Sequence, residues 1–437
     1  MKLHGIFLPH EKGTENSETI AVPLPSKVKI SMSQSMGAPC DPLVKKGDRV
    51  LVGQKIGDSD KFMSAPVHSS VSGTVTAVSD MLLANGRTCK AVEIETDGEQ
   101  EVSPDVKPPV VTDKESLCKA VRESGCVGLG GAGFPTHIKL NYNEAKGHVD
   151  SLVINGAECE PYITSDYRTM IEDADAVIDG IRIVKDTLKI EKCYIGIEDN
   201  KPEAIKILQK KAAEYNDIAV VKLKSSYPQG AEKVLAFNTT GRMIAEGQLP
   251  SDQGIIVMNV STAAFISSYI KTGMPLVTRR LTIDGDIVKT PCNVSAPIGT
   301  PYSELLKFAE ANMEFAHKII SGGPMMGMCV YDVETPLCKT NNAILAFKKP
   351  LDDGKKGKLK VNAQQTNCIK CGRCIAACPL GLMPQRFERA FDRKDKETLL
   401  RLKINLCMNC GACSYVCPAK RDLAEKNQLA KQFAMQK

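Results

Sequence analysis

Between Val22 and Glu95 the apolar residues come in short runs, and Gly, Pro and Asp turns separate these runs. Short runs rich in β-branched side chains and bounded by turn residues are typical of β-strands. We therefore predict an all-β module in this part of the chain. Its expected strands cover residues 27–30, 49–52, 73–78 and 91–94.

From about Asp113 to Ala264 the pattern changes, because helical and strand-like stretches alternate. Such alternation indicates an α/β domain with a mostly parallel sheet. Residues 271–346 return to short strands around one expected helix, 303–312, which suggests a small α+β unit. Within the α/β part we expect helices over residues 114–123, 169–188 and 201–215, and strands over residues 151–154, 193–197 and 254–258.

Two linkers separate these units from their neighbours. Residues 103–109 are rich in proline, and residues 352–360 are rich in charge and glycine. A chain of 437 residues is too long for one ordinary core, so we expect a multidomain fold of the α/β and α+β classes. The expected domains are residues 1–105 (β module), 110–265 (α/β), 270–346 (α+β) and 360–421 (cysteine-rich), with a polar, helix-prone tail at 422–437.

Composition narrows the class of protein. Hydrophobic residues make up 43% and charged residues 25%, as in soluble globular proteins, and no run of about eighteen apolar residues could cross a bilayer. The N-terminus turns polar at Glu11 without an apolar core or a cleavage site, so we expect no secretory signal and a cytoplasmic location.

The charge is uneven along the chain. Residues 348–437 hold 20 Lys and Arg but only 8 Asp and Glu, whereas the whole chain carries a net charge of +6. This basic end fits an acidic redox partner or an anionic membrane surface. It disfavours nucleic acid, because no aromatic residues for base stacking are interleaved with the basic ones.

Eight of the 17 cysteines fall into two runs, residues 368–378 and 407–417. Each run has the spacing C-x2-C-x2-C-x3-C followed by proline, and the fourth cysteine of such a run ligates the other cluster in two-cluster ferredoxins. A structural zinc site is the alternative, but zinc motifs occur as separated C-x2-C pairs. The sequence therefore predicts two [4Fe-4S] clusters. We expect cluster 1 on Cys368, Cys371, Cys374 and Cys417, and cluster 2 on Cys378, Cys407, Cys410 and Cys413.

A glycine-rich loop, residues 128–136 (GLGGAGFPT), lies just before an expected helix that contains Lys139. Glycines let backbone N–H groups approach an anion, and the lysine adds positive charge, so a phosphate-bearing cofactor fits. The loop matches neither the Walker nor the Rossmann pattern, and an ordinary turn stays an equal alternative. The candidate contacts in the loop are Gly128, Gly130, Gly131, Gly133 and Phe134.

A second polar pattern follows the apolar strand that ends at Ile154. The chain continues as NGAECEP and so places Asn155, Glu158 and Glu160 just beyond the strand. Polar groups at the carboxyl end of a strand in an α/β sheet lie where ligands usually bind. A solvated acidic turn that binds no ligand is an equally good interpretation of this stretch.

These two stretches together resemble the FMN- and NADH-binding domain of the large flavoprotein subunit of respiratory complex I. Residues 227–232 (YPQGAE) and 259–262 (NVST) resemble two further stretches of that family, although Ala157 stands where the family has an acidic residue. Residues 322–324 (GGP) lie in what resembles its β-grasp (SLBB-like) module. The resemblance implies non-covalent FMN with NAD(H) as substrate, and it assigns no side chain as a catalytic acid or base. It implies that the FMN phosphate lies near Gly131, Lys139, Asn259 and Thr262, the flavin ring near Asn155, Glu158 and Tyr227, and NADH near Phe134, Glu160 and Glu232.

The first module is similar to the barrel-sandwich fold of biotinyl and lipoyl carriers. In carriers the modified lysine stands at the tip of a full hairpin, but here only four residues separate Lys61 from Pro66. We therefore interpret Lys61 as an ordinary surface lysine and the module as an assembly or docking element.

The order of the modules over nearly the whole chain, with matches at residues 4–6 and 65–73, resembles the RnfC family of the Rnf complex, an ion-translocating ferredoxin:NAD⁺ oxidoreductase. This resemblance implies a peripheral subunit on the cytoplasmic face of the membrane that exchanges hydride between NAD(H) and FMN and single electrons with two [4Fe-4S] clusters. Its implied partners are other Rnf subunits, including integral membrane subunits, and indirectly ferredoxin. The alternatives are the diaphorase subunit of a soluble bifurcating hydrogenase or NADH dehydrogenase, and a non-catalytic protein that carries clusters for assembly or relay.

Overall fold

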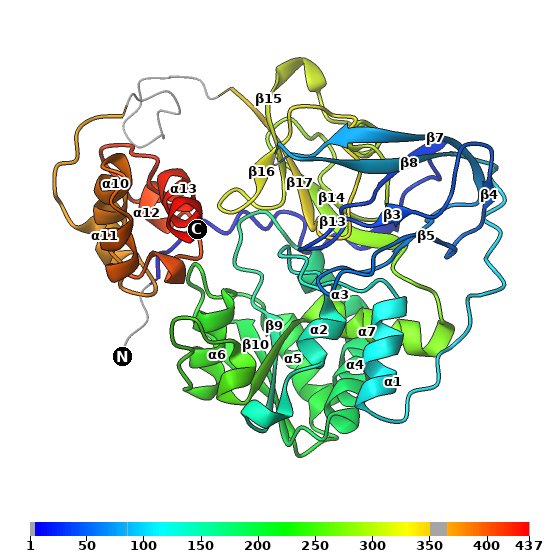
Figure 1. Ribbon diagram of the computed structural model, residues 1–437, viewed down its shortest axis with the longest axis horizontal. Coiled ribbons are helices and arrows are strands. Elements are labelled where there is room, and N and C mark those ends of the chain that lie inside the picture. Colours follow the sequence, from blue (N-terminus) through cyan, green and yellow to red (C-terminus); the bar gives the residue numbers. More distant parts are fainter. Residues whose placement is uncertain (1–4, 85, 350–364, 437) are drawn as a thin grey trace.

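The computed structural model describes residues 5–84, 86–349 and 365–436 (Figure 1). His4, the linker expected at residues 352–360 and the expected start of the cysteine-rich domain at residue 360 lie outside the described residues. Figure 1 shows the α/β domain at the bottom, two β-rich units above it, and the C-terminal helices to one side. No helix in these three described ranges is both long and apolar enough to span a bilayer.

The α/β domain contains a four-stranded sheet in the order β11-β10-β9-β12, and every neighbouring pair is parallel. The predicted parallel sheet is confirmed. Its strands are β9 (Ser151–Gly156), β10 (Lys192–Glu198), β11 (Ile218–Leu223) and β12 (Ile255–Asn259). Its helices are α1 (Lys114–Glu123), α2 (Thr136–Leu140), η1 (Glu144–Lys146), α3 (Ser165–Glu172), α4 (Ala174–Thr187), α5 (Pro202–Ala212), α6 (Glu232–Thr240), η2 (Pro250–Gln253) and α7 (Val260–Thr272).

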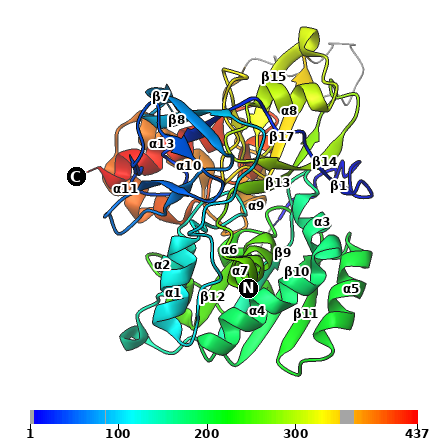
Figure 2. The ribbon, with the colours of Figure 1, turned by 90° about the vertical axis from the view of Figure 1, so that its right-hand side faces the viewer.

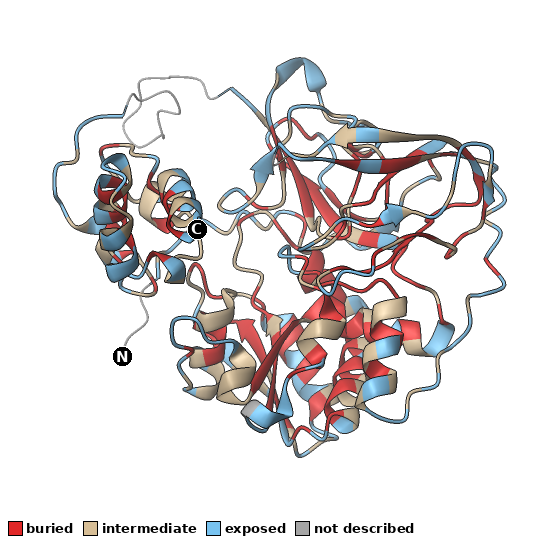
Figure 3. Cartoon of the chain, in the orientation of Figure 1, coloured by how far each residue is buried: buried red, intermediate tan, exposed pale blue. Residues whose placement is uncertain are grey.

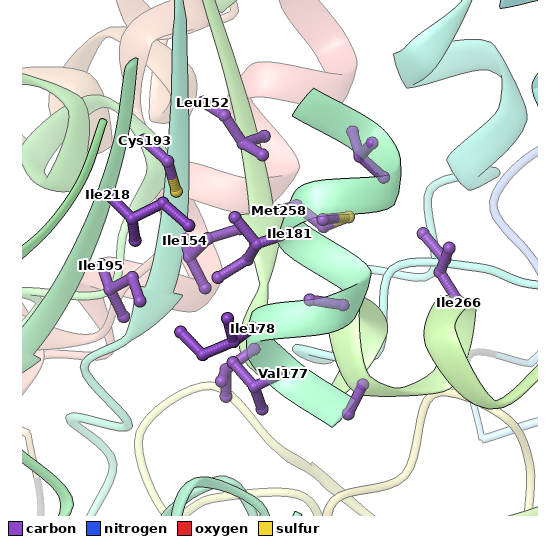
Figure 4. Close-up of a cluster of buried hydrophobic side chains, with 14 of the residues drawn as sticks. Leu152, Ile154, Val177, Ile178, Ile181, Cys193, Ile195, Ile218, Met258 and Ile266 are labelled. Carbon is purple, nitrogen blue, oxygen red and sulfur yellow. The ribbon is translucent and has the colours of Figure 1, made fainter. Parts of the chain in front are cut away.

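Helices cover both faces of this sheet, which explains why its strands are apolar at nearly every position. Successive side chains of a strand point to opposite faces. Ile154 packs into the cluster formed with α4 and α7, whereas its neighbour Val153 packs with Leu235 of α6. Figure 4 shows Ile178 and Ile181 of α4 directed at the strands.

The single helix predicted over residues 169–188 is wrong, because the chain leaves the helical conformation at Asp173 between α3 and α4. Asp173 has φ −117° and ψ 29°, and its carboxylate accepts a hydrogen bond of 2.6 Å from Arg280 Nη1. Arg280 belongs to a strand of another sheet, so the local sequence pattern carries no sign of this ion pair.

The N-terminal β module has the barrel-sandwich fold, as predicted. One sheet has the order β2-β8-β7-β4 and the other β3-β5-β6, and Ile30, Ile56 and Val75 are buried between them. Lys61 is exposed. The strands are β2 (Lys27–Ser31), β3 (Asp41–Pro42), β4 (Arg49–Val50), β5 (Lys55–Asp58), β6 (Val67–His68), β7 (Gly73–Leu82) and β8 (Thr88–Thr96).

The third unit is a six-stranded sheet in the order β1-β14-β13-β17-β15-β16 (Figure 2). Its edge strand β1 (Thr19–Ala21) comes from the N-terminal segment and pairs in parallel with β14. The N-terminal segment therefore joins a sheet whose other strands all lie after residue 277. The other elements are β13 (Thr278–Asp284), β14 (Cys292–Pro297), α8 (Tyr302–Phe308), η3 (Met313–Phe315), β15 (Ala316–Ser321), β16 (Met328–Cys329) and β17 (Ala343–Lys348).

The cysteine-rich domain is small and helical, and Figure 3 shows that fewer of its residues are buried than in the α/β domain. Phe387, Leu399, Ile404 and Ala430 form its core. The tail predicted to be helix-prone forms α13, which packs against α10. The helices are α9 (Arg373–Ala376), α10 (Pro384–Asp392), α11 (Lys396–Arg401), η4 (Ile404–Leu406), α12 (Ala412–Tyr415) and α13 (Leu423–Met435).

Candidate functional site

The sheet order of the α/β domain creates a natural ligand position. The chain runs from β9 outward to β10 and β11, and then returns to place β12 on the other side of β9. Ligands of open α/β sheets bind beyond the carboxyl ends of the strands at such a reversal. Asn155 is the last residue but one of β9, Asn259 ends β12, and the two are partners in the strand register. Two predicted cofactor contacts therefore meet at the switch point.

The glycine-rich loop lies over the N-terminus of α7. The backbone N–H of Leu129 donates to Oγ1 of Thr262 at 3.0 Å, and a Cβ at Gly130 would stand 3.3 Å from Asn259 Nδ2. Asn259 caps α7, because its Oδ1 accepts from the backbone N–H groups of Ser261 and Thr262. A helix N-terminus favours negative charge, so this place suits an anion.

Two properties of the loop leave room for such an anion. Gly130, Gly131 and Ala132 are exposed, and a Cβ at Gly131 would meet nothing within 4 Å. Gly131 also has φ +108°, a conformation that glycine adopts without strain. The backbone and the helix end together fit a cofactor phosphate.

Lys139 comes to the same place from α2. Its Nζ donates to the carbonyl oxygen of Val257 at 2.9 Å and to Glu232 Oε2 at 3.1 Å, and it stands 5.9 Å from the centre of the Phe134 ring. The structure thus brings Glu232, which lies 93 positions further along the chain, next to Lys139, with Phe134 nearby. An ammonium group has three donors, so one remains beyond these two bonds.

The other predicted contacts hold the backbone around the sheet edge. Asn155 Nδ2 donates to the carbonyl oxygen of Gly230 at 2.9 Å and so ties β9 to the loop that follows Tyr227. Glu158 accepts from the backbone N–H groups of Asp166 at 2.6 Å and Tyr167 at 3.1 Å, at the start of α3. Burial raises the pKa of the Glu158 carboxyl to about 7.

Sequence reasoning missed two residues that organise this edge. Lys12 is half-buried, and its Nζ donates to the carbonyl oxygens of Glu158, Glu160 and Ile163. Burial lowers the pKa of the Lys12 ammonium to about 8. Asp166 accepts from Asn259 Nδ2 at 2.7 Å and from the Ser261 hydroxyl at 2.6 Å. Neither residue belongs to a motif, so only the tertiary structure reveals them.

Four cysteines of the C-terminal domain line one cavity. Cys407, Cys410 and Cys413 come from the second run, and Cys378 is the last cysteine of the first run. In the other half, burial raises the pKa of the Cys374 thiol, and the neighbouring Cys417 raises it further. The structure therefore brings the last cysteine of each run toward the other run, which is the crossed arrangement expected from the spacing.

The chemistry of this cavity suits an iron-sulfur cluster. Burial raises the pKa of the Cys410 thiol to about 11, so the thiolate form needs a metal to stabilise it. Asn427 of α13 also lines the cavity, and both polar atoms of its amide are buried without a hydrogen-bond partner among the described residues. Four soft ligands with an unpaired amide beside them fit the cluster better than they fit a hydrophobic core.

The second cysteine run touches the edge of the α/β domain. The hydroxyl of Tyr227 donates to the carbonyl oxygen of Cys410 at 2.6 Å. It also lies 3.4 Å from Glu160 Oε1, and the other Glu160 oxygen accepts from the backbone N–H of Met325 at 3.0 Å. Burial raises the pKa of the Glu160 carboxyl to about 7. Two of the predicted NADH or flavin contacts, Glu160 and Tyr227, therefore stand directly beside a predicted cluster ligand.

The N-terminal segment holds this contact in place. The backbone N–H of Ile6 donates to the Tyr227 carbonyl oxygen at 2.9 Å, and the Tyr227 N–H donates back to Ile6 at 2.8 Å. Leu8 is buried in one cluster with Tyr227 and Ala412. Residues 6–12 therefore pack along both the cysteine-rich domain and the α/β domain.

Comparison with protein families agrees with this geometry. A family described as the Nuo51 FMN-binding domain matches residues 121–268, the RnfC barrel-sandwich hybrid domain matches residues 2–99, and a 4Fe-4S dicluster domain matches residues 367–421. The C subunit of the Na⁺-translocating ferredoxin:NAD⁺ oxidoreductase complex of Acetobacterium woodii is 42% identical over 388 residues, which are 87% of this chain and 85% of the relative. The chain belongs to the RnfC family.

Other members of the RnfC family support the assignment. The C subunit of the proton-translocating ferredoxin:NAD⁺ oxidoreductase complex of Clostridium ljungdahlii is 42% identical over 86% of this chain and 80% of its own length. The C subunit of the ion-translocating oxidoreductase complex of Rhodobacter capsulatus is 35% identical over 86% of this chain and 72% of its own length. The predicted family, the FMN-binding domain and the two-cluster iron-sulfur domain are thus confirmed.

Solved structures with much lower sequence identity to this chain show the same fold. The NAD⁺-reducing [NiFe]-hydrogenase matches with a TM-score of 0.50 and 15% identity in the H2-reduced state, and with 0.51 and 16% in the air-oxidised state. The match covers 74% of this chain and 61% of the hydrogenase chain, less than two thirds of its length. At this identity the likeness concerns the fold alone, and the diaphorase alternative has only this distant support.

Proposed function

We propose that this chain is the peripheral NADH/FMN/iron-sulfur subunit of an Rnf-type ion-translocating ferredoxin:NAD⁺ oxidoreductase. When bound, FMN exchanges hydride with NAD(H) and single electrons with one-electron carriers, and [4Fe-4S] clusters are such carriers. The observation that carries the proposal is the hydrogen bond from Tyr227 to Cys410, because it joins the switch point of the α/β sheet to a cavity of four cysteines.

For the flavin, we propose a phosphate site at the glycine loop and the start of α7. The exposed backbone of Gly131, the remaining donor of Lys139 and the N-terminal end of α7 support it. The residues of this site are Gly128, Gly130, Gly131, Gly133, Lys139, Asn259 and Thr262, with Asn155, Glu158 and Tyr227 toward the flavin ring and Phe134, Glu160 and Glu232 toward NADH.

In this arrangement the protein mainly positions the flavin and the nicotinamide and shields them from solvent. Glu158 and Lys12 fix the backbone beyond β9, and Asn155 fixes the Tyr227 loop against it. None of these side chains needs to take a proton from the nicotinamide, because hydride transfer is a direct reaction between nicotinamide and flavin.

For the clusters, we propose the crossed ligand sets, and the surroundings of the two sets support different tasks. The Cys410 loop faces the α/β domain. In the other loop Cys371 is exposed and Ile369 is 64% exposed. The neighbouring Lys370 and Arg373 are also exposed, and neither forms an ion pair in the described parts of the chain. An exposed apolar tip ringed by basic groups suits an acidic electron-transfer partner.

We assign that partner to the other Rnf-type subunits, among them integral membrane subunits, with ferredoxin reached through them. We therefore propose that the chain is a peripheral subunit on the cytoplasmic face of the membrane. The relatives named as ion-translocating complexes support this placement. Recovery of membrane subunits with the tagged chain is the expected result, and recovery of a hydrogenase instead would favour the diaphorase alternative.

The cofactor content tests the proposal most simply. After anaerobic purification we expect about eight iron atoms per chain from two four-iron clusters, and one FMN. Addition of NADH should bleach the flavin absorbance rapidly and the cluster absorbance after it. Iron without flavin, or no response to NADH, would reduce the chain to a relay or assembly protein.

A further inference from the structure

Helix α13 forms one wall of the cavity that Cys378, Cys407, Cys410 and Cys413 line. Ala424 and Asn427 of this helix both face that cavity. The helix is also bonded to the second cysteine run, because Lys431 Nζ donates to the Cys407 carbonyl oxygen at 2.9 Å and the Ala424 N–H donates to the Ser414 hydroxyl at 2.8 Å. A side chain of α13 is therefore held firmly against the cavity.

Asn427 is an unusual residue for its position on this helix. It lies on the buried stripe with Leu423, Ala430 and Ala434, at the spacing of an apolar helix face. The side chain is fully buried, yet neither Nδ2 nor Oδ1 has a hydrogen-bond partner in the described residues. Buried amides are normally paired, so this one calls for an acceptor that the described residues do not provide.

The matching position in the other half of the domain is fully paired. Glu388 follows Cys378 by the same ten residues by which Asn427 follows Cys417. The Glu388 carboxylate is 3% exposed and bonds Arg421 at 2.5 Å and Lys426 at 3.2 Å. The lack of a partner at Asn427 is thus not a general feature of this helical position. It belongs to the side of the domain where the four-cysteine cavity lies.

We infer that the Asn427 amide donates a hydrogen bond to a sulfur of the cluster held by Cys378, Cys407, Cys410 and Cys413. The inference rests on the ligand set proposed above. The nitrogen faces the cluster, because an anionic sulfur repels the amide oxygen and accepts from the N–H. A donor to a cluster sulfur stabilises the reduced form of the cluster, so Asn427 raises the reduction potential of cluster 2.

The test is a redox titration of Asn427→Leu, with each cluster followed by its EPR signal. Leucine keeps the size of the side chain and removes the donor. At a fixed potential the ratio of reduced to oxidised cluster 2 should fall about tenfold, which equals a potential lower by about 59 mV for one electron. Cluster 1 and the iron content should stay at the wild-type values. The control Gln428→Leu changes an exposed neighbour on the same helix and should shift neither cluster.

An unchanged potential of cluster 2 with full iron content would overturn the inference and leave the ligand assignment standing. If the wild-type protein holds no cluster on these four cysteines, the proposed ligand set fails, and the inference fails with it.

A second measurement needs no change at Asn427. The protein is labelled with side-chain ¹⁵N-asparagine in an Asn409→Gly background. This substitution removes the second asparagine that lines the cavity, and glycine tolerates the φ of +56° at that position. The reduced cluster 2 should show a ¹⁵N hyperfine coupling from Asn427. Absence of this coupling would overturn the inference.

Discussion

The two cysteine runs have the same spacing, but their surroundings differ. The run that ends at Cys417 touches the α/β domain through Cys410 and Tyr227, whereas the run that begins at Cys368 turns Ile369 and Cys371 toward solvent. One motif therefore occurs at an inner and an outer position. The spacing predicts that clusters bind, and the placement predicts which cluster exchanges electrons with the flavin and which with a partner.

The largest expected effect comes from Cys413→Ala, which removes a ligand of the inner set. NADH should still bleach the flavin, but the fast reduction of the remaining cluster should disappear, because the contact at Tyr227 then leads to no carrier. Stopped-flow absorbance of flavin and cluster bands measures both phases. Fast reduction of the remaining cluster in this variant would contradict the assignment of an inner position.

Cys374→Ala makes the matching change in the outer set. The flavin and cluster 2 should both respond to NADH as in the wild type, because in this arrangement electrons reach them without passing through the cluster on Cys374. Delivery of electrons to the membrane partner should fail. Loss of the fast reduction of cluster 2 in this variant would contradict the outer position of cluster 1.

A smaller effect is expected from Lys139→Ala, which tests the flavin end of the comparison. A charge-assisted hydrogen bond contributes about 1.5–3 kcal/mol, so the Kd for FMN should rise roughly 10- to 150-fold. Both clusters should stay intact. Lys119→Ala is the control, since Lys119 is exposed on α1. Unchanged flavin content after gel filtration would argue against the phosphate site.

The smallest effect is expected from Tyr227→Phe, which keeps the ring and removes the hydrogen bond to Cys410. Loss of one such bond costs about 1 kcal/mol, which corresponds to a rate of cluster 2 reduction lower by about fivefold. Tyr331→Phe is a matched control, because its hydroxyl donates to the Leu82 carbonyl oxygen at 2.9 Å on an exposed surface. Equal rates in the two variants would mean that the Tyr227 bond has only a structural role.

The sequence supports much of this account, because local spacing carries direct chemical information. The glycine loop, the carboxyl ends of β9 and β12 and the cysteine runs all lie in short stretches whose residue types suit one task. The contacts of Lys12 with three carbonyl oxygens and of Tyr227 with Cys410 could not be predicted, since they join residues more than 145 positions apart in the chain.

The tail shows where a pattern was visible but incomplete. Its polar residues suggested a helix, and α13 is one. Asn427 stands at an apolar position of that helix, which is the one signal in the sequence that could have marked it. What it faces depends on the packing of α13 against the cysteine loop. The break at Asp173 has the same origin, because it depends on Arg280 from another sheet.

The order of the two clusters is tested most directly by freeze-quench EPR of the wild-type protein after mixing with NADH. The variants Cys413→Ala and Cys374→Ala first assign the two cluster signals. The account predicts that the signal of cluster 2, on Cys378, Cys407, Cys410 and Cys413, rises before that of cluster 1. A cluster 1 signal that rises first would contradict the inner and outer positions.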